Sequence, residues 1–123
     1  MTDLSIEIAD SAFDYELGLM FRKSLDPNSG MLFVMKSPQK MNFWGANTYI
    51  PLDIAFIDEN KTITSIKKII PLSLKSVNSP DNSLYALETN INFFKNNNIT
   101  EGYKIEYSKN TLSFIPPKGQ EVE

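Results

Sequence analysis

The segment that most constrains the fold is a short run, Leu52–Ile57, in which Asp53 is the one residue that is not apolar. Pro51 precedes this run, and the turn-forming residues 58–61 follow it. A strand with apolar residues on both faces is typical of the centre of a sheet that is covered on each side. The run therefore predicts a central strand, and the turn predicts a hairpin to the next strand, residues 62–70.

Similar short runs of strand-forming residues are spread along the rest of the chain. In residues 3–11, Leu4, Ile6 and Ile8 alternate with polar residues, which predicts a half-buried strand. The other predicted strands are residues 30–35, 41–44, 84–89, 103–108 and 111–115, and the last two are expected to form a hairpin. Residues 37–40 are expected to form a turn, and residues 71–83 a polar loop.

One early segment, residues 11–25, has apolar residues at helical spacing instead. Asp10 or Ser11 can cap a helix here, and the pattern predicts an amphipathic helix of two to three turns. Gly18 costs a helix about 1 kcal/mol relative to Ala, which indicates close backbone packing or the end of the helix. The residues of the apolar face are Phe13, Leu17, Met20 and Phe21.

Strands dominate this pattern, and short links join neighbouring strands. The order predicts an α+β fold with a curved or barrel-like, mostly antiparallel sheet and one early amphipathic helix. Residues 1–116 are expected to form a single globular domain, and residues 117–123 a frayed tail.

The composition excludes several kinds of chemistry. The chain has no Cys and no His, so it offers no disulfide, no thiolate nucleophile and no imidazole ligand or base. We therefore assign no catalytic residue, no metal site and no cofactor. A net charge of −3 without a large basic cluster argues against nucleic acid as a partner.

The sequence predicts neither membrane insertion nor export. Its apolar runs are far shorter than the roughly 20 residues that span a bilayer, so no membrane span is expected. Its first residues include acids where a signal peptide has basic residues. We expect a chain that begins near Met1 and stays in the cytoplasm, with a virion as the alternative location.

Four ordered motifs lie along the chain: GLMFR at 18–22, GMLF at 30–33, FW..NT.IPLDI.FID at 43–58 and LE at 87–88. Together they resemble domain of unknown function family 192, a bacterial and archaeal family of small single-domain proteins. The resemblance covers residues 6–107 and implies a compact α+β fold with a curved sheet, but no agreed biochemical activity.

The chain departs from the family pattern directly after Trp44. The family usually has Met followed by Lys or Arg at this point, whereas this chain has Gly45 and Ala46. An anion bound through that basic residue would be held more weakly here. The small residues could instead let the backbone approach a ligand closely.

The polar and aromatic motif residues predict one candidate site near the Trp44 ring, at one end of the sheet. An aromatic surface with a few fixed donors and acceptors suits a sugar, a peptide end or another small polar ligand. Structural alternatives stay open: Trp44 as a core or rim residue, and Asn47 and Thr48 as partners of turn backbone groups. The candidate ligand-binding residues are Arg22, Trp44, Asn47, Thr48, Asp53 and Glu88.

Arg22 is the only arginine, against 11 lysines, which favours a position that requires a planar, bidentate guanidinium. The structural hypothesis is a partly buried clamp in which Arg22 pairs with Asp53 and with Glu88, because buried charges need partners.

Three functions are compatible with this pattern. The first is a non-catalytic accessory module that binds a small ligand or a protein segment. The second is a structural or assembly subunit of a larger particle, such as a virion. The third is a hydrolase for a polar substrate, with Asp53 and Glu88 as an acid–base pair across an open cleft.

Overall fold

The structure, a computed structural model, describes residues 3–119. Two short helices, α1 (Ala12–Leu17) and α2 (Phe93–Asn96), accompany the strands. The strands are β1 (Asp3–Ala9), β2 (Ser29–Gln39), β3 (Asn42–Phe43), β4 (Leu52–Ile57), β5 (Ile63–Ile69), β6 (Val77–Asn78), β7 (Ser83–Asn90), β8 (Lys104–Ser108) and β9 (Thr111–Ile115).

Seven strands form one sheet in the order β5-β4-β7-β2-β1-β9-β8, and β3 pairs with β6 in a separate ribbon. Only β1 and β2 run parallel within the sheet, because α1 and the loop after it carry the chain back between them. All the other pairings in the sheet are antiparallel, which confirms the predicted fold class.

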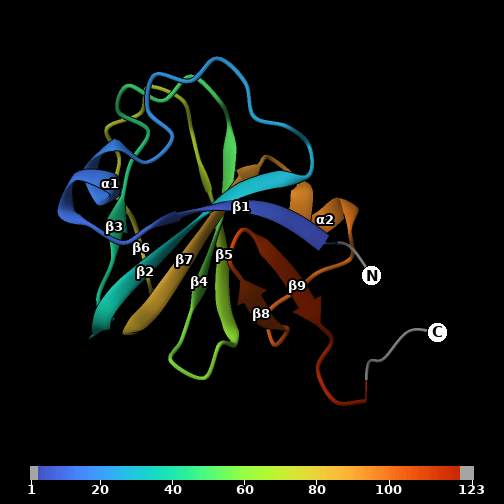
Figure 1. Cartoon of the computed structure of the whole chain (residues 1–123). Helices are drawn as coiled ribbons and strands as arrows, with labels where there is room; N and C mark the ends of the chain where they lie inside the picture. Colours follow the sequence, from blue (N-terminus) through green and yellow to red (C-terminus); the bar gives the residue numbers. More distant parts are fainter. Residues whose placement is uncertain (1–2, 120–123) are drawn as a thin grey trace.

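The sheet curls until its two edge strands meet at one end (Figure 1). The Ile63 N–H donates to the Tyr103 carbonyl at 2.8 Å, and the Ile105 N–H donates to the Lys61 carbonyl at 2.9 Å. These bonds join β8 to the start of β5, so the expected curved, barrel-like sheet is confirmed.

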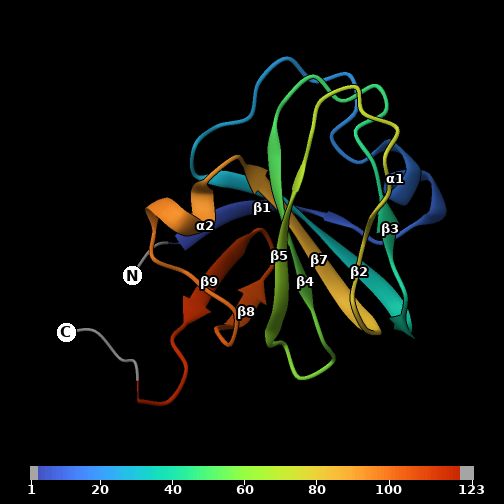
Figure 2. The same ribbon diagram turned by 180° about the vertical axis from the view of Figure 1, so that it is seen from behind.

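Different elements cover the two faces of the central strands, α2 on one side and α1 with β3 on the other (Figure 2). Inside the curl, Leu32, Leu87 and Phe114 pack with the rings of α2. On the outer face, Phe33, Ile54 and Phe56 pack beneath α1 and the β3–β6 ribbon. All six residues of β4 are therefore buried, as predicted for a central strand.

The early helix is shorter than predicted. α1 begins after Ser11, whose Oγ accepts a hydrogen bond from the Asp14 N–H at 3.2 Å, and it ends at Gly18. Gly18 has φ +46°, and a Cβ there would lie 3.3 Å from the Phe33 ring. Both interpretations of Gly18, helix end and close packing, are confirmed.

Strand structure also occurs in two segments where a turn and a loop were expected. β2 continues to Gln39 through residues expected to form a turn, with an irregular register between Val34 and Gln39. The segment 71–83, expected to be a loop, contains β6, because Val77 pairs with Phe43 of β3.

The chain ends lie partly outside the described part of the protein. The expected start near Met1 and residues 120–123 of the predicted tail fall outside residues 3–119, and the single-domain assignment stays a prediction. No helix within residues 3–119 is long and apolar enough to cross a membrane.

Candidate functional site

A cavity of about 590 Å³ lies between α1 and the outer face of the sheet. α1 and the residues after it contribute one wall, which includes Phe13, Tyr15 and Leu17. β3 and the loop that follows it contribute the opposite wall, which includes Trp44 and Thr48.

Glu88 of β7 contributes the charged group at the sheet side of this cavity. It is only 4% exposed, and no hydrogen bond or ion pair reaches its carboxyl group from any of residues 3–119. Its neighbours across the strands are Met31 and Ile54, both apolar. Burial raises the pKa of Glu88 from 4.5 to about 8, so this group is largely a neutral acid at neutral pH.

Aromatic rings line the same cavity as the Glu88 carboxyl group. Phe13 is 73% exposed and Trp44 is 50% exposed, so both rings lie at the mouth of the cavity. The Tyr15 hydroxyl donates to the Val34 carbonyl at 2.6 Å, which fixes one wall. Phe33 and Phe43 pack edge to face with centroids 5.1 Å apart.

The aromatic residues of α1 were not among the predicted site residues. The sequence pattern in this segment was an apolar stripe at helical spacing, and such a stripe usually packs against the core of a protein. In the structure no residue of α1 is buried, and Phe13 and Leu17 line the cavity. The helical stripe therefore marks side chains that line the cavity, rather than a face that is buried in the core.

Gly45 and Ala46 do not open space for a ligand, in contrast to the expectation. A Cβ at Gly45 would lie 1.8 Å from the Ile70 carbonyl oxygen. The Gly45 N–H donates to the Ser73 carbonyl, and the Leu72 N–H donates to the Gly45 carbonyl. Residues 70–73 of the chain itself therefore lie against the Gly45 backbone, where a ligand was expected.

Thr48 and Asn47 have local partners. The Thr48 hydroxyl donates to the Ala46 carbonyl at 3.1 Å, although Thr48 also lines the cavity. Asn47 has φ +53°, which Asn tolerates better than most residues, and its carbonyl accepts from the Phe21 N–H at 2.8 Å. Asn47 does not line the cavity and instead ties the loop to the segment after α1.

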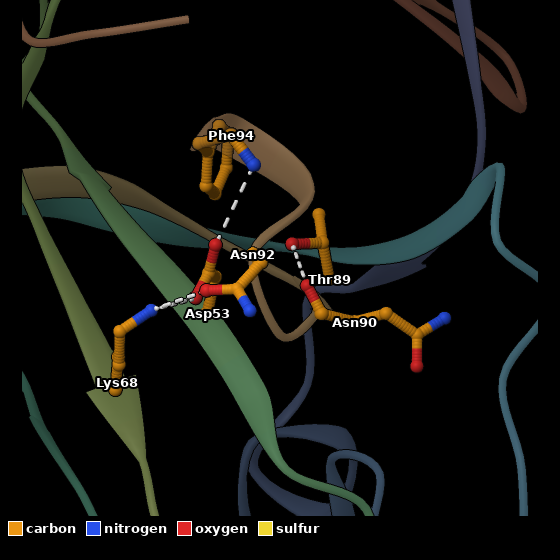
Figure 3. Close-up of polar contacts among 6 residues, drawn as sticks. All are labelled: Asp53, Lys68, Thr89, Asn90, Asn92 and Phe94. Atoms are coloured by element: carbon orange, nitrogen blue, oxygen red, sulfur yellow. Dashed lines mark hydrogen bonds and ion pairs between the residues drawn. The ribbon is translucent and has the colours of Figure 1, made fainter. Parts of the chain in front are cut away.

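Asp53 lies on the other face of the sheet and caps α2 (Figure 3). It is 2% exposed, and its carboxylate accepts from the Lys68 ammonium at 3.2 Å and from the Phe94 N–H at 3.4 Å. The Asn92 side chain at the start of α2 makes no capping bond of its own. Asp53 therefore takes the capping role from a distant strand.

The predicted clamp of Arg22 with Asp53 and Glu88 is wrong. Arg22 instead makes a bidentate pair with Glu7 of β1, at 2.5 and 2.8 Å, and both side chains are partly exposed. The short helix ends before Arg22, so the guanidinium reaches the outside of β1 rather than the site.

Asp53 and Glu88 cannot act as an acid–base pair across one cleft. Glu88 is opposite Ile54 in the β4–β7 pairing, while Asp53 is opposite Thr89. Successive residues of a strand point to opposite faces, so the two carboxyl groups are separated by the sheet itself. The hydrolase hypothesis based on this pair is therefore wrong.

Comparison with known proteins identifies the family. The sequence model of domain of unknown function family 192, described as "Uncharacterized ACR, COG1430", matches residues 1–107. The chain belongs to this family. The resemblance inferred from the four motifs is thus confirmed, and a search of curated proteins gave no match.

Two solved structures share the fold of this family 192 protein. One, from Sinorhizobium meliloti 1021 and described as a candidate transcription regulator, is 34% identical, with a TM-score of 0.82 over 84% of this chain and 81% of that one. The other, a protein of unknown function from Novosphingobium aromaticivorans DSM 12444, is 31% identical, with a TM-score of 0.80 over 83% of this chain and 74% of that one.

All four motifs that carry the family 192 resemblance meet at the cavity. GLMFR contributes Gly18, Leu19 and Met20, and GMLF contributes Phe33. The remaining lining residues from the motifs are Phe43, Trp44, Thr48 and Glu88.

Proposed function

We propose that this family 192 protein is a binding module that holds a small, partly apolar ligand in the cavity beneath α1. The observation that carries the proposal is the buried Glu88 carboxyl group, which faces the cavity without a partner among residues 3–119. An apolar pocket with a few polar groups is the usual form of a small-molecule site.

The size and the walls of the cavity support this function. A volume of about 590 Å³ lies in the range of sites for small organic molecules. Because Phe13 and Trp44 are half or more exposed, burial of a ligand against their rings would remove apolar surface from water.

The single tryptophan gives a direct test by NMR. Trp44 yields one indole N–H resonance, which can be followed while small amphiphilic probes are added: 3,3-dimethyl-1-butanol, benzyl alcohol, choline and 3,3-dimethylbutanoate. We expect at least one probe to shift this resonance and the Gly18 amide in a saturable manner. The Glu106 amide of β8 should not move, because Glu106 does not line the cavity.

Two exposed aromatic residues provide matched variants. Phe13→Ala removes a cavity wall, whereas Tyr49→Ala removes a ring that is 51% exposed and does not line the cavity. Phe13→Ala should weaken binding several-fold, and Tyr49→Ala should leave it unchanged. Equal effects of the two variants, or no saturable shift with any probe, would overturn the proposed function.

The description of the Sinorhizobium protein suggests regulation of transcription, but this chain offers poor support for contact with DNA. Its net charge is −3. Lys67 and Lys68, which lie side by side in β5, already donate to the Asn78 carbonyl and to Asp53. We therefore propose that nucleic acid is not its ligand.

A second candidate function, association with another protein chain, is favoured by a group of exposed apolar residues. The loops that carry them are bonded together, since the Phe21 N–H donates to Asn47 and the Leu72 N–H donates to Thr48. Light scattering after size exclusion tests self-association, and a monomer at every concentration would contradict it. The exposed residues are Phe21, Tyr49, Ile70, Leu72 and Leu74.

A further inference from the structure

The structure contains two buried carboxyl groups whose surroundings differ in one respect. Among residues 3–119, Asp53 and Glu88 are the buried charged side chains. Asp53 is paired with Lys68 and with a backbone N–H, as a buried charge requires. Glu88 has an equivalent degree of burial but no such partner within the described residues.

The chain cannot easily supply that partner from nearby. The described lining of the cavity contains Glu16 and Glu88 as its charged residues, and neither Lys nor Arg. The residues that face Glu88 from the neighbouring strands are apolar. A positive charge at this place would therefore have to come from a ligand.

The walls favour a cation for a second, independent reason. Aromatic faces attract cations through the negative potential of their rings, most strongly for tryptophan. The cavity is lined by Phe13, Tyr15, Phe43 and Trp44, in addition to the buried Phe33. Aromatic walls with an acidic group and without a basic one are the arrangement that recognises alkylated ammonium groups.

We infer that the ligand of this cavity is a small organic cation, an alkylated ammonium compound that lies between the aromatic walls and pairs with the ionised carboxylate of Glu88. This inference rests on the proposed function, because it names the chemical class of the ligand for the same site. A ligand anion would find no Lys or Arg in the described lining of the cavity to pair with.

Binding of such a cation should be coupled to loss of the Glu88 proton. A positive charge beside the carboxyl group stabilises its ionised form and so lowers the pKa that burial has raised. Affinity should therefore increase as pH rises through the pKa of the free protein. The other titratable groups that line the cavity are Tyr15 and Glu16, both from α1.

Choline and 3,3-dimethyl-1-butanol form a suitable probe pair, because they share a shape and differ in the charged nitrogen. The dissociation constants of both probes are measured from Trp44 fluorescence at about pH 6 and about pH 9, on either side of the Glu88 pKa. We expect choline to bind about tenfold or more tightly than the alcohol at the higher pH, and the ratio to fall at the lower pH.

Variants separate the role of the charge from general binding. Glu88→Gln should reduce the preference for choline about tenfold and remove its pH dependence, while Glu106→Gln, an exposed carboxyl on β8, should change neither. Glu16→Gln should have a smaller effect, because Glu16 is exposed and its charge is screened by water. If Glu88→Gln does not fold, Phe13→Ala at the exposed rim tests the preference for a cation through the aromatic wall, and it should weaken choline binding more than binding of the alcohol.

The possible failures are distinguishable. Equal or tighter binding of the neutral alcohol at both pH values would overturn the cation inference and leave the proposed function in place. If neither probe binds saturably, and no probe of the NMR panel shifts the Trp44 resonance in a saturable manner, the proposed function itself is overturned.

Discussion

At the scale of single residues, the two buried carboxyl groups of the sheet have different partners. Asp53 accepts hydrogen bonds from the Lys68 ammonium and the Phe94 N–H, while Glu88 has apolar neighbours across the strands, and burial raises its pKa to about 8. Asp53 is opposite Thr89, and Glu88 is opposite Ile54, the residue after Asp53. Because successive residues of a strand point to opposite faces, the two carboxyl groups lie in different environments. The face of the sheet on which a carboxyl group lies, rather than the type of residue that carries it, therefore decides its partners.

The pH dependence of stability tests the environment of Glu88. Its pKa is 4.5 without burial and about 8 in the folded protein, so the unfolded chain releases this proton at lower pH than the folded one. The free energy of unfolding should therefore fall as pH rises from about 5 to about 8, by about 1 kcal/mol per pH unit from this group. Urea unfolding at a series of pH values measures the effect.

The variant Glu88→Gln should lack this contribution, because the amide does not titrate. The difference in unfolding free energy between wild type and variant should change with pH over that window and become constant above it. Glu106→Gln is the control with an exposed carboxyl group. A difference that is independent of pH would show that Glu88 titrates normally in the folded state.

At the scale of elements, neither helix is stable through its own sequence. α1 has six residues and α2 has four, both shorter than isolated helices need to be. Ser11 caps α1 locally, whereas α2 depends on Asp53 from β4, which lies 41 residues before Phe94. The helices are held by contacts that the folded sheet provides.

Removal of the remote cap should destabilise the protein through α2. Asp53→Ala leaves the Phe94 N–H and the Lys68 ammonium without their buried acceptor, and we expect a loss of about 2 kcal/mol in unfolding free energy. The exposed Asp81→Ala is the control and should cost less than about 0.5 kcal/mol. Chemical denaturation measures both, and equal small losses would contradict the capping role.

At the scale of the whole molecule, the seam between β5 and β8 turns an open sheet into a nearly closed one. Its bonds connect Lys61 and Ile63 with Tyr103 and Ile105. Closure satisfies backbone groups that an edge strand would leave free for pairing with other chains. It also fixes the curvature that separates the inner core from the outer face with its cavity.

Hydrogen exchange tests this closure. If the seam opens only when the protein unfolds, the Ile63 and Ile105 amides should exchange as slowly as those of the buried strand β4. Rapid exchange of these two amides beside slow exchange in β4 would show that the edges separate in the native state. NMR or mass spectrometry at the level of single residues gives the comparison.

Local patterns were enough for most strands and for the family. The apolar run of β4, the alternation of β1 and the hairpin of β8 and β9 appear at or near their predicted positions, because strand period and turn residues act over a few neighbours. The motifs likewise identified the family, since their order and spacing are properties of the sequence alone.

Sequence patterns predicted only part of the candidate site. Trp44, Thr48 and Glu88 line the cavity, whereas Arg22, Asn47 and Asp53 do not. Motif residues show which positions belong together in a family, but they do not show the face of the sheet on which each side chain lies.

The sequence by itself therefore determined the strand pattern, the kinds of chemistry excluded by the absence of His and Cys, and the segments that contribute to the site. The tertiary structure decided the partners: Glu7 for Arg22, α2 for Asp53, and an open cavity for Glu88. The physical reason is that strand period and turn propensity act between neighbours along the chain. The partner of a charge depends instead on register and curvature, which arise only when distant segments pack together.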